Sequence, residues 1–159
     1  MNKQCISIIL IALLIAGCTT APAIYTAKPP DSSEDSRRSL LLGWWYGEAK
    51  TKEGGKRLQI TDRSVDGTFK VEFRIIEGSG KVWDQTEVGL WGISGPVYFT
   101  ITKGWVGGGR FLPADPTQAT FYDAYEILEL SKDKFRYKHF AIGDEYTMKR
   151  VSDSFSFPE

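Results

Sequence analysis

The sequence between residues 69 and 75 reads Phe69-Lys70-Val71-Glu72-Phe73-Arg74-Ile75 and alternates strictly between apolar and polar side chains. This period of two is the period of a β-strand, and it predicts a strand with one buried and one solvated face. The run follows Asp66-Gly67, a dipeptide typical of tight hairpin turns. Before that turn, Leu58-Gln59-Ile60-Thr61 also alternates. The stretch from 58 to 75 therefore predicts a β-hairpin, and it decides the fold class.

Further alternating runs flank this hairpin at similar spacing. We expect the other strands at 45–50, 81–90, 97–103, 124–130, 135–141 and 145–151. Turn signals such as Gly78-Ser79-Gly80 and Ser94-Gly95-Pro96 separate them. No segment shows a helical period long enough to pack against a sheet. Eight antiparallel strands joined mostly by hairpins, without a covering helix, predict an all-β up-and-down barrel, with a β-sandwich as the alternative.

The N-terminal end has the features of a secretion signal. Lys3 supplies a positive charge, and residues 6–16 are apolar apart from Ser7. A helix of this length spans about 16 Å, whereas the hydrocarbon core of a bilayer is about 30 Å thick. The segment is therefore too short for a stable membrane anchor of its own.

The residues Ile15-Ala16-Gly17-Cys18 resemble the lipobox of bacterial lipoproteins. The resemblance implies cleavage after Gly17, removal of residues 1–17 and acylation of Cys18, so that acyl chains hold the protein at a membrane. An ordinary cleaved signal and a short uncleaved anchor are the alternatives. Thr19, rather than an aspartate, follows the cysteine. Resemblance to lipoproteins of Gram-negative bacteria then implies the cell envelope, at the outer membrane and facing the periplasm.

The segment after the signal has the composition of a tether. Residues 18–39 contain Pro22, Pro29 and Pro30 and a cluster of serines, which predicts a flexible chain. We expect the barrel domain at 40–151 and a C-terminal tail at 152–159. Both cysteines of the sequence precede the barrel. No disulfide, zinc site or nucleophilic thiol is therefore expected in the domain.

Composition and charge exclude several classes of function. Hydrophobic residues make up 42% and aromatic residues 13% of the sequence, so a core rich in rings is expected and disorder of the whole chain is not. Twenty basic residues balance twenty acidic ones, which gives no support to nucleic-acid binding. The residues Asp115, Asp123 and Glu126 lack the spacing of a calcium loop and are interpreted as solvated charges.

The search for catalytic residues finds one histidine, His139, in a predicted strand. A single histidine there is expected to pack or to lie at a rim rather than to act as a base. The Gly107-Gly108-Gly109-Arg110 run lacks the following Gly-Lys-Ser/Thr of a phosphate loop. We therefore expect no catalytic residue, no metal and no cofactor.

Two short motifs carry a resemblance to a family of barrels. Gly43-Trp44-Trp45 at the start of the first strand resembles the Gly-x-Trp signature of lipocalins and bacterial lipocalin-like proteins, and Lys149-Arg150-Val151 resembles their final motif. In that family the tryptophan closes the narrow end of the barrel and the late arginine stacks on its ring. The resemblance implies these barrel-floor roles for Trp45 and Arg150. An eight-stranded barrel either holds one small ligand or is filled by its own side chains.

The connection from Gly104 to Gln118 is longer than the other predicted turns and contains Trp105, Phe111 and Leu112. Long loops are usually functional or disordered. We expect these apolar side chains to form a lid over the barrel mouth, to contact a partner protein, or to pack on the barrel wall.

Two functions follow from these expectations. The first is a membrane-tethered, non-enzymatic carrier of a small apolar ligand. The second is a filled barrel that acts as a scaffold or interaction module of the envelope, with an unknown protein partner. A hydrolase or isomerase ranks third. A cavity lined by inward apolar residues would favour the carrier, and the candidate ligand-binding or lid residues are Phe69, Val71, Phe73, Trp105, Phe111, Tyr137 and Met148.

Overall fold

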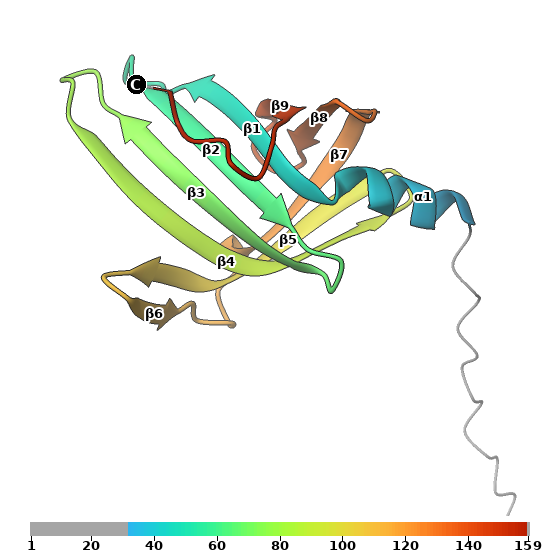
Figure 1. The fold of residues 1–159 in the computed structure, drawn as a ribbon. Coiled ribbons are helices and arrows are strands. Elements are labelled where there is room, and N and C mark those ends of the chain that lie inside the picture. The colour runs from blue at the N-terminus through green and yellow to red at the C-terminus, as the bar shows by residue number, and fades with distance from the viewer. Residues whose placement is uncertain (1–31, 159) are drawn as a thin grey trace, which may run out of the picture.

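The computed structural model describes residues 32–158, which form a β-barrel with one helix at its end (Figure 1). The first two described elements are the helix α1 (Ser32–Leu41) and the strand β1 (Gly43–Lys50). The other elements are β2 (Lys56–Arg63), β3 (Thr68–Ile76), β4 (Val82–Ser94), β5 (Val97–Gly107), β6 (Arg110–Pro113), the short 3₁₀ helix η1 (Ala119–Phe121), β7 (Tyr122–Leu130), β8 (Lys134–His139) and β9 (Glu145–Arg150). Within these described residues, no helix is both long enough and apolar enough to cross a bilayer.

Eight of these strands form a closed ring. They pair antiparallel in the order β1, β2, β3, β4, β5, β7, β8 and β9, and β9 pairs back to β1 with Trp45 opposite Arg150. Neighbours in the ring are also neighbours in sequence once β6 is left aside. The prediction of an all-β, eight-stranded up-and-down barrel is therefore confirmed, and the alternative of a β-sandwich is excluded.

The strand β6 lies outside the ring and pairs with the end of β5, from Gly104 opposite Pro113 to Gly107 opposite Arg110. Most of the connection predicted as an irregular loop is therefore a β-hairpin, and β5 continues past its predicted end at Lys103. The turn contains Gly108 and Gly109 with φ of 56° and 73°. Glycine adopts these left-handed angles without strain, so the glycine run makes the tight turn that joins the two strands.

The helix α1 occupies positions that the sequence analysis assigned to the tether. Its last turn packs on the barrel, since Leu41 is fully buried and the Arg38 guanidinium lies 4.3 Å from the centre of the Trp91 ring. A helix of ten residues is marginal by itself in water, so these contacts stabilise it. The prediction of a flexible tether is wrong for residues 32–39. The predicted signal, Cys18 and the rest of the tether lie outside the described residues.

Two apolar clusters stabilise the barrel, one inside and one outside. The inner cluster lies around Trp45 and Phe135 at the end where α1 packs, which we call the closed end. The outer cluster consists of buried Tyr46, Leu58 and Ile60. The segment after β9 crosses the outside of β1 and β2 and adds Phe155 and Phe157 to this outer cluster (Figure 1). The predicted tail is therefore part of the packed fold.

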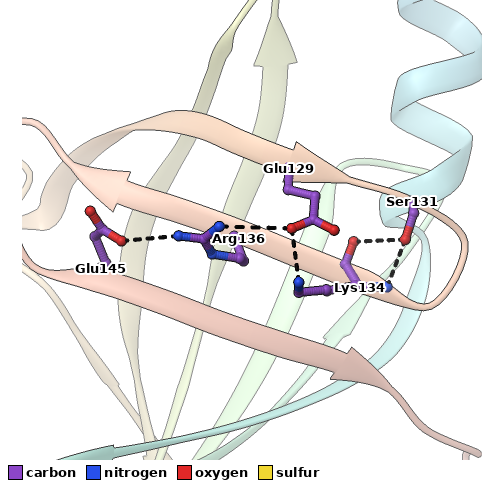
Figure 2. A network of polar contacts seen from close by, with 5 residues as sticks. All are labelled: Glu129, Ser131, Lys134, Arg136 and Glu145. Atoms are coloured by element: carbon purple, nitrogen blue, oxygen red, sulfur yellow. Dashed lines mark hydrogen bonds and ion pairs between the residues drawn. The ribbon is translucent and has the colours of Figure 1, made fainter.

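The outer wall of β7, β8 and β9 is polar instead. Figure 2 shows Arg136 between Glu129 and Glu145, with nitrogen to oxygen distances of 3.8 and 3.3 Å, and Lys134 2.9 Å from Glu129. Ser131 bonds to the backbone of Lys134 and closes the β7–β8 turn. These side chains are substantially exposed, so their ion pairs contribute little to stability. The alternate residues of β8 point into the barrel.

Candidate functional site

The interior of the barrel contains a cavity of about 540 Å³. This volume falls in the range of small-molecule sites, roughly 300–1,000 Å³. The lining begins with buried Arg63 and Tyr98 near the closed end and reaches exposed Tyr122 and Ile142. The cavity therefore opens at the end opposite α1. We call this opening the mouth, and its residues are Ala119, Thr120, Tyr122, Ala141 and Ile142.

Trp45 and Arg150 close the other end. Trp45 is fully buried, and its indole nitrogen donates to the carbonyl of Leu41 at 3.0 Å. The Arg150 guanidinium lies 4.4 Å from the centre of the Trp45 ring and donates to the carbonyls of Leu40 at 2.6 Å and Leu42 at 2.8 Å. Arg150 thus ties the helix C-terminus and the first strand together over the tryptophan. The structure places both residues together at the closed end.

One wall of the cavity is made of rings. The side chains of Phe69, Val71 and Phe73 line it from β3, and Tyr137 faces them from β8. Burial raises the pKa of the Tyr137 and Tyr125 hydroxyls above the ordinary value for tyrosine. These phenols are therefore neutral hydrogen-bonding groups at any physiological pH. Met148 also belongs to the predicted apolar lining, but it packs within the inner cluster and does not line the cavity.

The neighbouring wall, on the strand paired with β3, is polar. The strand β2 points Arg57, Gln59, Thr61 and Arg63 into the cavity. The candidate lining residues named from the sequence are apolar or aromatic and do not include these polar groups. The apolar residues of β2 face outward because the C-terminal segment covers them there.

Arg63 has an incomplete set of partners. The residue is 2% exposed, and its Nε and Nη2 atoms donate to the hydroxyl oxygen of Tyr98 at 3.1 and 2.9 Å. Its Nη1 atom is buried and has no hydrogen-bond partner among residues 32–158. In the same range, no carboxylate lies within ion-pair distance of the guanidinium. Buried arginines are ordinarily paired, which makes this site unusual.

Glu87 lines the cavity from β4. Its Oε1 atom accepts hydrogen bonds from Gln85 at 2.8 Å and from the indole of Trp105 at 3.3 Å. Burial raises the pKa of the Glu87 carboxyl above its ordinary value, and the bond from Trp105 opposes the shift.

The residues proposed as a lid lie outside the cavity lining. Trp105 packs edge-on against Phe121 at 5.4 Å, and Phe111 is 54% exposed on the β5–β6 hairpin. Neither residue lines the cavity, whereas Phe69, Phe73 and Tyr137 do. The structure therefore separates the predicted set into cavity residues and hairpin residues.

His139 lies at the rim near the mouth and holds a turn. Its Nδ1 atom accepts hydrogen bonds from the backbone nitrogens of Ala141 at 3.0 Å and Ile142 at 3.3 Å. The proton of the neutral ring then sits on Nε2, which lies 3.0 Å from the Asp123 carboxylate. Both ring nitrogens are thus engaged within the protein. This position matches the packed or rim role expected for the histidine.

The three acidic residues weighed as a calcium site have separate surroundings. Asp115 accepts hydrogen bonds from Thr117 in the chain before η1, Asp123 contacts His139, and Glu126 is exposed. Among the described residues, no group of three or more potential metal ligands comes together.

Sequence reasoning missed the polar side of the cavity, above all Arg63, Tyr98 and Glu87. A usable signal existed in β2, where Arg57, Gln59, Thr61 and Arg63 recur with a period of two. This alternation predicts the strand, but it does not indicate that the polar face points into the barrel.

Comparison with known proteins finds similarity among solved structures. No protein-family model matches the sequence, and no curated protein matches it. Among solved structures, a lipocalin-like protein from Bacteroides uniformis is similar, with a TM-score of 0.42 and 15% sequence identity. The similarity covers 70% of this chain and 99% of that chain. The barrel assignment rests on the strand pairing described above.

Proposed function

We propose that this chain is a membrane-tethered extracytoplasmic lipoprotein whose barrel binds one small molecule without transforming it. The observation that carries the binding function is the cavity of about 540 Å³ in a barrel that is closed at one end. Its mixed lining favours an amphipathic ligand over a purely apolar one, because the rings of β3 and the polar groups of the neighbouring β2 line the same cavity. A non-enzymatic role agrees with His139, since both of its ring nitrogens are already engaged.

The position of the mouth supports a tethered carrier. The chain enters the barrel through α1 at the closed end (Figure 1). The residues that line the mouth lie at the opposite end. An acyl anchor at Cys18 would therefore hold the protein from the side of the closed end. The mouth would stay accessible to ligands that arrive from the periplasm.

The binding function is tested by native mass spectrometry of the protein purified from membranes, together with extraction of bound molecules. We expect a stoichiometric small molecule in the wild type. The Val71→Trp variant should lose it, because Val71 is 5% exposed and lines the cavity, so the larger side chain fills the space. Val65→Trp is the matched control, since Val65 is 78% exposed. Absence of any bound mass in the wild type, or retention of the mass in Val71→Trp, would contradict the proposal.

An interaction module is the second candidate, and a specific observation favours it. The β5–β6 hairpin exposes Val106, Phe111 and Leu112, which are 42%, 54% and 56% exposed. Exposed apolar side chains that gather on one element are typical of protein contacts. If the Phe111→Ser, Leu112→Ser double variant loses a co-purifying protein while the wild type carries no small molecule, the interaction module replaces the carrier.

The lipoprotein part of the proposal is tested at the anchor. Cys18→Ser should abolish labelling by a palmitate analogue and leave the precursor uncleaved after Gly17, because the thiol is the acyl acceptor in the lipobox reading. Thr19→Ser keeps the cysteine and is the matched control. Normal cleavage of Cys18→Ser would show that an ordinary signal peptidase processes the chain.

A further inference from the structure

Two hydrogen-bond donors at the inner end of the cavity lack an acceptor. The first is Nη1 of Arg63, which is buried and unpaired within residues 32–158. The second is the hydroxyl hydrogen of Tyr98, whose oxygen already accepts two bonds from Arg63 and which has no acceptor of its own in the described structure. Both residues line the cavity. The two donors therefore lie next to each other at the inner end of the cavity.

The acidic groups of the cavity do not supply the missing acceptor. Glu87 is bonded to Trp105 and Gln85, and Asp123 is bonded to His139. A second arginine, Arg57, also lines the cavity, but it lies six residues earlier in β2, about 20 Å away at 3.3 Å per residue. The inner end of the cavity thus carries a positive charge without a counter-charge.

An uncompensated guanidinium inside a protein is costly, because it has lost its hydration without gaining a full set of partners. Retaining Arg63 for packing alone is a poor explanation, since an apolar residue would fill the space without this cost. A ligand that brings an acceptor would remove the cost on binding. The chemistry of that acceptor follows from the two free donors.

We infer that Arg63 and Tyr98 form a subsite for the carboxylate of the ligand, which enters acid end first. A carboxylate is planar and offers two oxygens, one for Nη1 of Arg63 and one for the hydroxyl of Tyr98. The remainder of the ligand then lies along Phe69, Val71 and Phe73 towards the mouth. This inference rests on the proposed binding function and specifies its ligand as an amphipathic carboxylic acid.

The test compares 4-phenylbutyrate with 4-phenylbutyramide, which share their shape and differ in charge. Binding is measured by saturation-transfer NMR on the mature protein in phosphatidylcholine nanodiscs, with empty nanodiscs as the blank. The acid should bind at least about tenfold more tightly than the amide, as expected for a charge-assisted hydrogen bond. Arg63→Met should remove this preference. Arg136→Met removes the same charge from the outer wall and should preserve it.

The stability of the free protein separates binding from a structural role. Because Arg63→Met removes an unpaired buried charge, its thermal unfolding temperature without ligand should equal or exceed that of the wild type. If Arg63→Met does not fold, Arg63→Lys takes its place. The lysine ammonium group lacks the planar fork of the guanidinium, so Arg63→Lys should lower the preference for the acid over the amide. An unchanged preference would overturn the subsite.

The outcomes distinguish the subsite from the binding function. Equal affinity of acid and amide in the wild type would overturn the carboxylate subsite and leave the carrier proposal standing. A preference that persists in Arg63→Met would also overturn the subsite and move the charge recognition to Arg57. Failure of both compounds to saturate, together with no bound mass in the native protein, would overturn the subsite and the carrier together.

Discussion

Trp45 and Tyr46 are neighbours in β1, yet they belong to different cores of the molecule. Trp45 points inward and packs with Phe135 at 6.1 Å between ring centres. Tyr46 points outward and contacts Phe155 of the C-terminal segment at 5.0 Å. The inner core closes one end of the barrel, whereas the outer core fastens the chain's last residues across β1 and β2.

The comparison shows how a small barrel keeps a cavity and still folds. A cavity reduces the number of apolar contacts inside the barrel. A small domain buries little apolar surface, so this loss lowers its stability appreciably. Here the outer cluster of Tyr46, Leu58 and Ile60 supplies a second buried surface. The inner wall of β2 is thereby free to carry polar groups. We therefore expect stability to reside in the closed end and the outer core, and binding in the cavity between them.

The largest expected effect is at the closed end. Trp45→Ala should lower the free energy of unfolding by about 3–5 kcal/mol, because it leaves a cavity beneath α1 and removes the bond to Leu41. Urea denaturation followed by circular dichroism measures this change. Tyr122→Ala at the mouth is the control and should change the value by less than about 0.5 kcal/mol. A loss below about 1 kcal/mol for Trp45→Ala would remove the distinction between the two ends.

The outer core is expected to contribute almost as much. Ile60→Ala should cost about 2–4 kcal/mol, because Ile60 is 3% exposed beneath the C-terminal segment. Val65→Ala, at an exposed turn position, is the matched control for loss of a branched apolar side chain. Deleting residues 152–159 should reduce the cost of Ile60→Ala in the same denaturation experiment, since the covering rings are then absent. Full additivity of the two changes would show that the segment does not cover Ile60.

A smaller effect is expected from the pair that closes the barrel. Arg150→Ala removes the donor to the carbonyls of Leu40 and Leu42 as well as the contact with Trp45. In a double-mutant cycle, Arg150→Ala and Trp45→Ala should therefore show a coupling above about 0.5 kcal/mol. Arg150→Lys keeps the charge and should recover only part of the stability, because an ammonium group lacks the planar fork. Independent effects would mean that the two residues close the barrel separately.

The sequence predicted the barrel because strand patterns are local. The alternation at 69–75 and the Asp66-Gly67 turn reflect constraints that act within one hairpin. Alternation alone does not reveal which face points inward, since that depends on what covers the other face. In β3 the apolar residues Phe69 and Val71 point in, whereas in β2 the apolar residues Leu58 and Ile60 point out. Only the distant C-terminal segment explains the difference.

The same reasoning accounts for the other corrections. The helix α1 ends in Leu40 and Leu41 but is otherwise polar, and its stability comes from contacts with the barrel that no local pattern reports. The barrel-floor positions of Trp45 and Arg150 follow from two short motifs, but the unpaired donor of Arg63 arises from strands β2 and β5 that are distant in sequence. The sequence predicted either a ligand cavity or a filled barrel, so the cavity was one of two alternatives. The charged side chains that line the cavity were not predicted.

The smallest expected effect concerns the one cavity carboxylate whose pKa is raised. Burial makes the charged form of Glu87 unfavourable in the folded state, so the folded protein holds this proton more tightly than the unfolded chain does. The contribution of this group to stability is therefore most favourable at low pH and is lost as the pH rises from the ordinary pKa of 4.5 through the raised value.

Glu87→Gln removes this dependence of stability on pH. Its unfolding free energy relative to the wild type should consequently increase between about pH 4 and pH 7. The control Glu126→Gln makes the same change at an exposed carboxylate outside the cavity lining. Urea midpoints at several pH values measure both differences. A constant difference for Glu87→Gln would show that Trp105 and Gln85 compensate the buried charge fully, and that the cavity carries no electrostatic cost at this position.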